Sequence, residues 1–257
     1  MKDQVIDFSV CDGIARIVLD DGERHNVVGL QFVRELAHAA IACEGRDDIR
    51  VILLTARGKE FSVGGDLHEF MRERANLRPH VREMATYFHL AITVLNRLEI
   101  PVVCAVNGVA GGGGVSMVLM SDLAIATRSA KFNLAYTRIG LTPDGGASWF
   151  LPRLVGAQRA FDIMATNPTL SADEACAMGL IARVVDDDAF AAVIDKVLAQ
   201  LAAAPSGAVG QAKRLLRASL VNSLEQQLEL ESQSIADQAA KPATLARMEA
   251  FFAERRK

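Results

Sequence analysis

Residues 100–115 read Ile-Pro-Val-Val-Cys-Ala-Val-Asn-Gly-Val-Ala-Gly-Gly-Gly-Gly-Val, so an apolar strand pattern runs into four consecutive glycines and then into a helix-like segment. Glycine carries no Cβ, and a ligand can therefore come close to the backbone N–H groups of such a run. At the start of a helix these groups bind a phosphate, or a carbonyl oxygen that develops negative charge. The stretch thus predicts a strand, an anion-binding turn and a helix in succession.

A second glycine turn, Phe61-Ser-Val-Gly-Gly-Asp-Leu67, follows the apolar strand pattern of residues 51–55. Two strands that each end in a loop with a bare N–H can supply two donors to one developing oxyanion. A dinucleotide loop fits less well, because the run at 111–114 lacks the G-x-G-x-x-G spacing and no Gly-Lys-Ser/Thr follows it. The other interpretation is that the glycines only let a helix pack closely against the sheet.

The composition is that of a globular chain with balanced charge. Its 257 residues are 51% hydrophobic, enough for a sizeable core in one domain with a helical C-terminal element. The formal net charge is −3, from 28 basic and 31 acidic residues, so we expect no nucleic-acid partner. We also expect no membrane partner, because no signal-peptide pattern is present and no apolar run reaches roughly 20 residues.

The four cysteines are widely spaced, and three of them lie inside apolar patterns. This distribution favours reduced, buried thiols over disulfides or metal ligands. His25 and His68 likewise show no metal-ligand spacing with a cysteine or a carboxylate. We therefore expect a cytoplasmic protein without a metal site.

Apolar periodicity and turn residues predict an α/β core. The predicted segments are a hairpin of 5–8 and 14–19, a helix over 30–42, strands over 51–55, 102–106, 123–126 and 180–185, and a helical capping box at 171–174. Short apolar strands separated by helices are typical of a mostly parallel sheet with crossovers. Beyond Pro205 the patterns are helical, and the last predicted helix runs from Pro242 to Arg256.

Together these motifs resemble the crotonase (enoyl-CoA hydratase/isomerase) superfamily over nearly the whole chain. The matching segments are 24–28, 61–67, 101–116, 121–125, 130–132, 139–146, 151–156 and 170–175. The resemblance implies a crotonase (ClpP-like) fold of repeated ββα units. It implies an acyl-CoA-binding, catalytic core at 1–205 and a C-terminal helical trimerisation region at 206–257. The implied substrate is an acyl-CoA thioester, with no cofactor besides the CoA of the substrate, and the implied assembly is a homotrimer or a hexamer.

The resemblance also assigns binding roles. Gly65 and Gly113 should give the two N–H groups that hold the thioester oxygen. The residues expected near the CoA are Arg24, Val27, Asp66 and Leu67.

The acid/base groups distinguish the reactions of this family. Hydratases place two glutamates around a water, whereas the matching positions here are Ser116 and Tyr136. Asp144, in Thr142-Pro-Asp-Gly-Gly146, matches the catalytic aspartate of epoxyphenylacetyl-CoA and double-bond isomerases, and also the nucleophilic aspartate of 4-chlorobenzoyl-CoA dehalogenases. A lone carboxylate can take a proton from one carbon and return it to another. The favoured interpretation is therefore an enoyl-CoA isomerase with Asp144 as the base.

Each candidate residue also has a structural interpretation. Asp144 can be a helix N-cap. Tyr136, His89 and Ser116 are possible acyl-pocket residues. Tyr136 can hydrogen-bond the substrate or only pack, and His89 matches a dehalogenase histidine or is a core residue. Ser116 leaves room for a bulkier acyl group.

Three alternative functions stay open. The first is an enoyl-CoA hydratase that uses Asp144 with Tyr136 or a second water. The second is dehalogenase-like substitution. The third is a non-catalytic homologue that binds acyl-CoA or associates with RNA.

Overall fold

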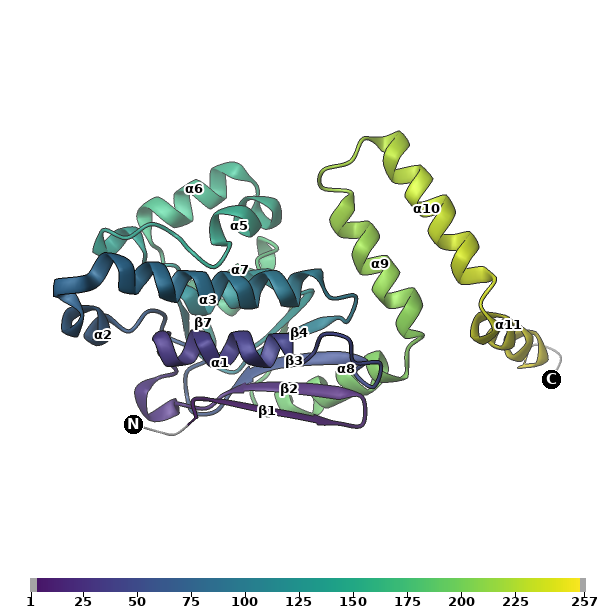
Figure 1. Ribbon diagram of the computed structural model, residues 1–257, viewed down its shortest axis with the longest axis horizontal. Coiled ribbons are helices and arrows are strands. Elements are labelled where there is room, and N and C mark those ends of the chain that lie inside the picture. Colours follow the sequence, from purple (N-terminus) through teal and green to yellow (C-terminus); the bar gives the residue numbers. More distant parts are fainter. Residues whose placement is uncertain (1–3, 255–257) are drawn as a thin grey trace. The chain divides into compact units, whose positions relative to one another are not determined.

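The computed structural model describes residues 4–254, and its central element is a six-stranded sheet in the order β1-β2-β3-β4-β6-β9 (Figure 1). The strands are β1 (Ile6–Cys11), β2 (Ile14–Leu19), β3 (Val51–Ala56), β4 (Val102–Val106), β6 (Leu123–Thr127) and β9 (Arg183–Val185). β1 and β2 pair antiparallel, and every later pair is parallel. The predicted hairpin and strands are confirmed, except that the predicted strand over 180–185 is shortened to β9.

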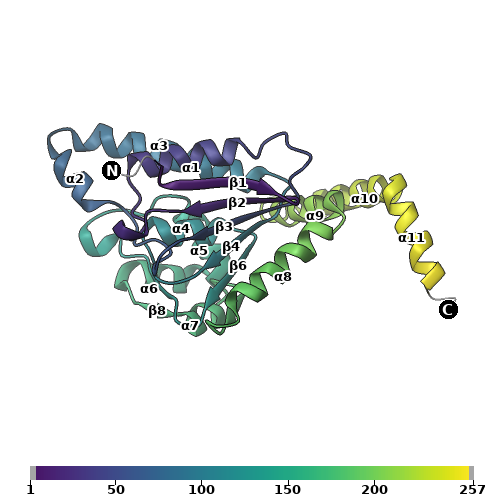
Figure 2. The same ribbon diagram turned by 90° about the horizontal axis from the view of Figure 1, so that it is seen from below.

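Helices cover both faces of this sheet. Ile52 and Leu54 of β3 belong to the same buried cluster as the inner faces of α1 (Leu30–Ile41) and α3 (Leu77–Arg97). Val51 and Leu53 point the other way and pack with Ile194 and Leu198 of α8 (Phe190–Ala203). Figure 2 shows α1 and α3 on one side of the strands and α8 on the other. Burial on both faces explains why the central strands are continuous apolar runs.

A second, small sheet has the order β5-β7-β8. Its strands are β5 (Ala110–Gly111), β7 (Lys131–Asn133) and β8 (Leu170–Ser171). The remaining helices of residues 1–203 are η1 (Gly22–Arg24), α2 (Leu67–Arg72), η2 (Arg74–Asn76), α4 (Gly113–Met120), η3 (Thr137–Ile139), α5 (Ala147–Val155), α6 (Ala157–Thr166) and α7 (Ala172–Ala177). Every residue of α4 is buried. The predicted capping box of Ser171 and Glu174 is confirmed at the start of α7.

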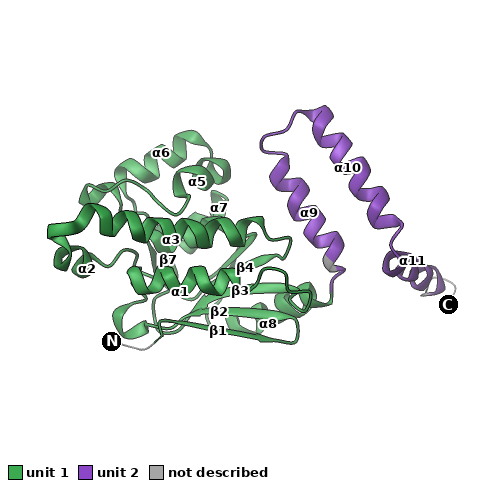
Figure 3. Ribbon diagram, viewed as in Figure 1, with its two compact units in different colours: residues 1–203 green, residues 204–257 purple. Residues whose placement is uncertain are grey.

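The chain divides into two compact units, residues 1–203 and 204–257 (Figure 3). The described part of the second unit consists of α9 (Ser206–Ala218), α10 (Leu224–Ala239) and α11 (Pro242–Glu254). The predicted end of the last helix at Arg256 lies outside the described residues. Large apolar side chains of this unit are exposed, including Leu245 at 50% and Phe252 at 61%. The trimerisation role of 206–257 stays a prediction.

The four cysteines are free thiols. Cys43 and Cys104 are buried, Cys176 is half-buried and Cys11 is exposed. Within residues 4–254, no three or more His, Cys, Asp or Glu side chains are grouped as a metal would require. No single helix in the described part of the chain is long and apolar enough to cross a membrane. The bent pair of α8 and α9 has the required length and apolar composition only when the two helices are taken together.

Candidate active site

Two glycine loops meet beside the ends of β3 and β4. These strands are parallel neighbours, so their carboxyl ends lie at the same edge of the sheet. The Ser62 N–H donates to the Val109 carbonyl at 3.1 Å, and the Gly111 N–H donates to the Ser62 carbonyl at 2.7 Å. The loop that leads into α2 is thereby hydrogen-bonded to the loop that leads into α4.

Gly64, Gly111 and Gly114, which lie in these loops or at the start of α4, are required by close packing. A Cβ on Gly64 would lie 2.8 Å from the Gly111 carbonyl oxygen, and one on Gly111 would lie 2.7 Å from the Val63 carbonyl oxygen. A Cβ on Gly114 would lie 2.5 Å from the Ser62 carbonyl oxygen. Such contacts with backbone atoms are too short for any other residue. At these positions the packing interpretation of the glycines is correct.

Gly65 and Gly113 differ from those three. A Cβ on Gly65 would meet only the Phe70 ring at 3.8 Å, and one on Gly113 would meet Phe88 and Val28 at 3.5 Å. These are ordinary van der Waals distances. Packing therefore does not explain why these two positions carry no side chain.

The N–H groups of Gly65 and Gly113 have no acceptor among residues 4–254. Gly113 is the first residue of α4, so its N–H belongs to the unpaired first turn of that helix. Gly65 lies between the two hydrogen bonds of a bridge in which Val28 pairs with Gly64 and Asp66. Gly65 is exposed, whereas Gly113 is buried at the helix start. Two free donors on adjoining loops can bind one oxyanion, which stays a prediction for these residues.

Asp144 lies between η3 and α5, and its carboxylate is held by a tyrosine. The Tyr136 hydroxyl donates to Asp144 Oδ1 at 2.7 Å. Ser116 Oγ lies 3.0 Å from the Tyr136 hydroxyl and 3.0 Å from the Asp144 carbonyl oxygen. The helix-cap interpretation of Asp144 is wrong, because the N-cap of α5 is Gly146 and no side chain caps this helix.

The two oxygens of the Asp144 carboxylate have different surroundings. Tyr136 is 8% exposed and Ser116 is fully buried, whereas Asp144 is half-buried. Burial, together with the Asp144 charge, raises the pKa of Tyr136 well above its usual value, so the hydroxyl remains a donor. Asp144 Oδ2 has no hydrogen-bond partner in the described part of the chain. One oxygen is therefore fixed and the other is available.

His89 fixes the backbone next to Asp144. It is exposed on α3, so the alternative of a buried core histidine is wrong. Its Nε2 accepts the Gly145 N–H at 3.1 Å, which places the proton of the neutral imidazole on Nδ1. Gly145 has φ +56°, and a Cβ there would lie 2.4 Å from Phe88 and 2.7 Å from Ser116 Cβ. This turn therefore requires glycine.

The structure brings the predicted base close to a predicted oxyanion donor. Ser116 follows Gly113 by three residues on α4, a rise of about 4.5 Å along the helix axis. The same serine donates to the Asp144 carbonyl. Phe88 packs beside both regions, since its ring lies near the Cβ directions of Gly113 and Gly145.

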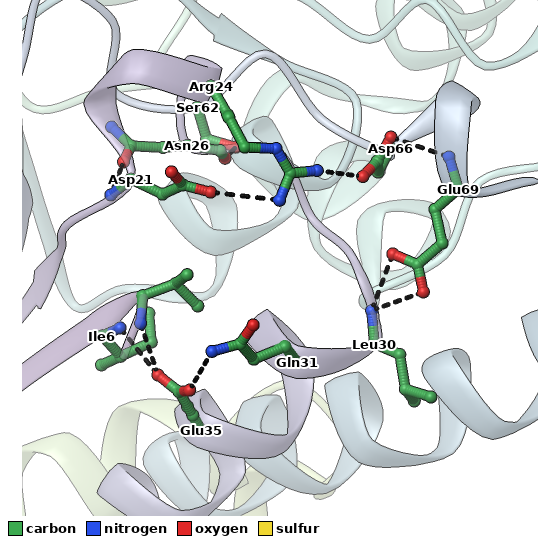
Figure 4. Close-up of polar contacts among 11 residues, drawn as sticks. Ile6, Asp21, Arg24, Asn26, Leu30, Gln31, Glu35, Ser62, Asp66 and Glu69 are labelled. Carbon is green, nitrogen blue, oxygen red and sulfur yellow. Dashed lines mark hydrogen bonds and ion pairs between the residues drawn. The ribbon is translucent and has the colours of Figure 1, made fainter. Parts of the chain in front are cut away.

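Two of the four residues predicted to contact CoA, Arg24 and Asp66, belong to a second polar cluster (Figure 4). Arg24 pairs with Asp66 and with Asp21, and its side chain is 47% exposed. Asp66 is 2% exposed and caps α2 by accepting the Glu69 N–H at 2.9 Å. Its side chain therefore positions Arg24 and α2 rather than reaching a ligand itself.

The other members of this predicted set are more accessible. Val27 is half-buried and Leu67 is 46% exposed. A cavity of about 120 Å³ lies beside Arg24 and Val27, and Arg72 of α2 also lines it. These side chains can contact a large anionic substrate.

Asn26 and Ser62 are structural residues of the site that the sequence analysis missed. Asn26 is fully buried, and its side-chain amide donates to the Arg57 and Glu60 carbonyls at 2.9 and 3.0 Å. The Ser62 hydroxyl donates to the Asn26 carbonyl at 2.7 Å. Both residues stand in the motifs that carry the family resemblance, but only the folded chain shows that they bind these loops together.

Comparisons with known proteins show the family of this chain. A family model described as enoyl-CoA hydratase/isomerase matches residues 10–257. A 4-chlorobenzoyl coenzyme A dehalogenase of Arthrobacter sp is 36% identical over 97% of this chain and 91% of its own length. The 1,2-epoxyphenylacetyl-CoA isomerase of Escherichia coli K12 is 35% identical over 85% of this chain and 84% of its own length.

The fold has close counterparts among solved structures. The crystal structure of an enoyl-CoA hydratase from Bacillus anthracis is similar with a TM-score of 0.91 at 27% identity, covering 98% of this chain and 97% of the other. The expected crotonase fold is thereby confirmed. The chain belongs to the enoyl-CoA hydratase/isomerase family, and it is an acyl-CoA enzyme of the crotonase superfamily.

Proposed function

We propose that this enzyme is an enoyl-CoA isomerase, which shifts a double bond or rearranges a ring, with Asp144 as its single acid/base. Asp144 Oδ2 takes a proton from the α or γ carbon of the thioester and returns it to the other carbon. The observation that carries the proposal is the carboxylate itself, with one oxygen held by Tyr136 and the other unoccupied. One positioned carboxylate is sufficient for both proton transfers.

The negative charge of the intermediate belongs on the thioester oxygen. The proposed donors to that oxygen are the N–H groups of Gly65 and Gly113, each contributing roughly 2.7–4 kcal/mol to the transition state. Because Gly113 is buried, an oxygen that reaches it leaves bulk water, and the interaction is strengthened. The proposed reaction uses no cofactor besides the CoA of the substrate, which Arg24, Val27 and Leu67 would contact.

Hydration is less well supported than isomerisation. The two positions that match the glutamates of hydratases carry Ser116 and Tyr136, and their hydroxyl oxygens lie 3.0 Å apart. These hydroxyls form hydrogen bonds with each other and with Asp144, and neither is a base at neutral pH. A hydratase would have to activate water with Asp144 alone.

Substitution at a halogenated ring is the second candidate, favoured by the 36% identity to a 4-chlorobenzoyl coenzyme A dehalogenase and by Asp144 as a potential nucleophile. That reaction needs a base for the water that releases the product. His89 matches the histidine position, but its Nε2 already accepts the Gly145 N–H at 3.1 Å. His89 Nε2 is therefore not free to take the proton of that water.

The assay that separates these reactions uses a panel of aliphatic and aromatic 2-enoyl- and 3-enoyl-CoA thioesters, together with 4-chlorobenzoyl-CoA. Products are analysed by ultraviolet absorbance and by mass spectrometry. Isomerisation changes the absorbance at constant mass, and hydration adds the mass of one water. Loss of chloride identifies substitution. Hydration or chloride release as the fast reaction would contradict the proposal.

We also propose that residues 206–257 assemble the enzyme as a trimer or hexamer. Exposed apolar side chains of α11, including Leu245, Met248, Phe251 and Phe252, are the support. Light scattering at micromolar concentration should give a mass of three or six chains. A monomer would contradict this, and truncation after Ala240 should dissociate the assembly.

A further inference from the structure

We propose that Tyr136 is a positioning residue for Asp144: its hydroxyl occupies Oδ1 and makes Oδ2 the one carboxylate oxygen that exchanges protons with the substrate. Ser116 orients the Tyr136 hydroxyl from the other side. This inference rests on the proposed role of Asp144 as the base. It gives Tyr136 a function different from packing or from direct contact with the acyl group.

The number of protons on Tyr136, Ser116 and Asp144 indicates the direction of the hydrogen bonds between them. Tyr136 and Ser116 each carry one hydroxyl proton, and the ionised Asp144 carboxylate carries none. The Tyr136 hydroxyl keeps its proton and points it toward Asp144 Oδ1, because that hydrogen bond is the shortest at 2.7 Å and its acceptor is charged. The Ser116 proton then faces the Tyr136 oxygen and the Asp144 carbonyl oxygen, both at 3.0 Å.

Burial shields these hydrogen bonds from water. Tyr136 is 8% exposed and Ser116 is fully buried, so water has little access to either hydroxyl. The pKa of Tyr136 is raised well above its usual value by burial and by the Asp144 charge, so the phenol keeps its proton. It therefore donates to Asp144 and cannot act as the base in its place.

The hydroxyl should change both the basicity and the orientation of Asp144. A hydrogen bond to the ionised form lowers the pKa of a carboxyl group, and its removal raises it. Removal also takes away the hydrogen bond that distinguishes Oδ1 from Oδ2 and holds the orientation of the carboxylate. A residue that only packed would change neither property.

The direct test is Tyr136→Phe, with isomerisation of 3-hexenoyl-CoA or, if that acyl group does not react, exchange of the α protons of hexanoyl-CoA in D₂O. We expect the acidic limb of the kcat/KM profile, or of the exchange rate, to move up by about one pH unit. We expect kcat to fall roughly 10-fold while KM changes less than about twofold. An unshifted acidic limb would overturn the inference.

Two control variants separate the effect of the Tyr136 hydroxyl from other causes of a changed pH profile. The chain has two tyrosines, and Tyr87→Phe removes the other hydroxyl, so it should leave the profile unchanged. Tyr136 and His89 are the titratable groups hydrogen-bonded to residues 144 and 145 within the described structure. His89→Gln keeps an acceptor for Gly145 but has no imidazole, so an acidic limb that persists in this variant does not come from His89.

A second substitution tests the inference if Tyr136→Phe does not fold. In Tyr87→Phe, incorporation of 3-fluorotyrosine labels Tyr136 alone and gives a more acidic hydroxyl, which is a stronger donor. The acidic limb should then move to lower pH, opposite to the effect of Tyr136→Phe. No shift, or a shift upward, would contradict the inference.

The proposed function and this inference fail in different ways. If Asp144→Asn retains proton exchange, the proposed base is wrong. If Asp144→Asn loses exchange while the fluorotyrosine protein and Tyr136→Phe both keep the wild-type profile, Asp144 is the base and Tyr136 does not position it.

Discussion

Asp66 directly follows a pair of glycines and Asp144 directly precedes one, yet the two carboxylates are held in different ways. Asp66 is 2% exposed and uses both oxygens, one on the Arg24 guanidinium and one on the Glu69 N–H. Asp144 is half-buried and bonds through one oxygen to the neutral Tyr136 hydroxyl. A carboxylate with both oxygens engaged stabilises the fold, whereas one with a free oxygen can exchange a proton.

The largest effect is expected for Asp144→Asn. The amide keeps the size of the side chain but cannot take a proton, so kcat should fall about 1,000-fold. Binding of hexanoyl-CoA by calorimetry should be retained, because Asp144 is not a proposed CoA contact. The thermal midpoint should stay near that of the wild type.

One result would contradict this distinction between Asp66 and Asp144. It is a loss of folding or of binding in Asp144→Asn, with unchanged kcat in the fraction that remains folded. Asp144 would then be a structural carboxylate like Asp66.

The next effect tests the oxyanion donor. Gly113→Pro removes one N–H at the first position of α4, where proline is compatible with the helix, and should lower kcat about 100-fold. Gly113→Ala is the control, because its Cβ meets ordinary contacts at 3.5 Å and its N–H remains. Equal kcat in the folded proline and alanine variants would show that this N–H does not bind the oxyanion.

A smaller effect, on stability rather than turnover, is expected for Asp66→Asn. Loss of the buried charge removes one of the two ion pairs of Arg24, leaving the pair with Asp21, and should destabilise folding by about 2 kcal/mol. Urea unfolding measures this, and kcat should stay within about threefold of wild type. A kcat loss as large as that of Asp144→Asn, without a stability change, would reverse the roles of the two residues.

The smallest effect concerns a buried group with no proposed function. Burial raises the pKa of Cys43 from 9.0 to about 11, so its protonated form is favoured in the folded state. The stabilisation is fully present below pH 9.0 and is lost as the pH rises toward 11. Cys43→Ala should therefore lose less thermal stability across this window than the wild type or Cys176→Ala. An identical slope in all three proteins would disagree with this.

Much of the fold follows from the sequence because buried strands and amphipathic helices have distinct periodicities. β4 and α1 appear within one residue of their predicted bounds. The long helix α3 was harder to predict, because its buried positions begin only at Met84. The sheet β5-β7-β8 has strands of two or three residues, too short to show a period.

The sequence predicts which residues belong to the candidate site, but not which of them contact one another. The glycines and Asp144 stand in recognisable motifs, and the family resemblance points to Gly113, but the run of four glycines itself gives no physical reason to separate Gly113 from Gly114. Only the packing does, since a Cβ on Gly114 would meet a carbonyl at 2.5 Å. The bonds from Ser116 and Tyr136 to Asp144 join residues from different elements, and no local pattern predicts them.

The most direct test of Asp144 as the base is proton exchange into D₂O, measured by NMR on hexanoyl-CoA and 3-hexenoyl-CoA bound to the wild type and to Asp144→Asn. The account predicts that the wild type incorporates deuterium at the α carbon, and at the γ carbon of the enoyl substrate. The folded Asp144→Asn variant should bind both thioesters and incorporate none above the rate in buffer. Exchange at the wild-type rate in Asp144→Asn would contradict the account.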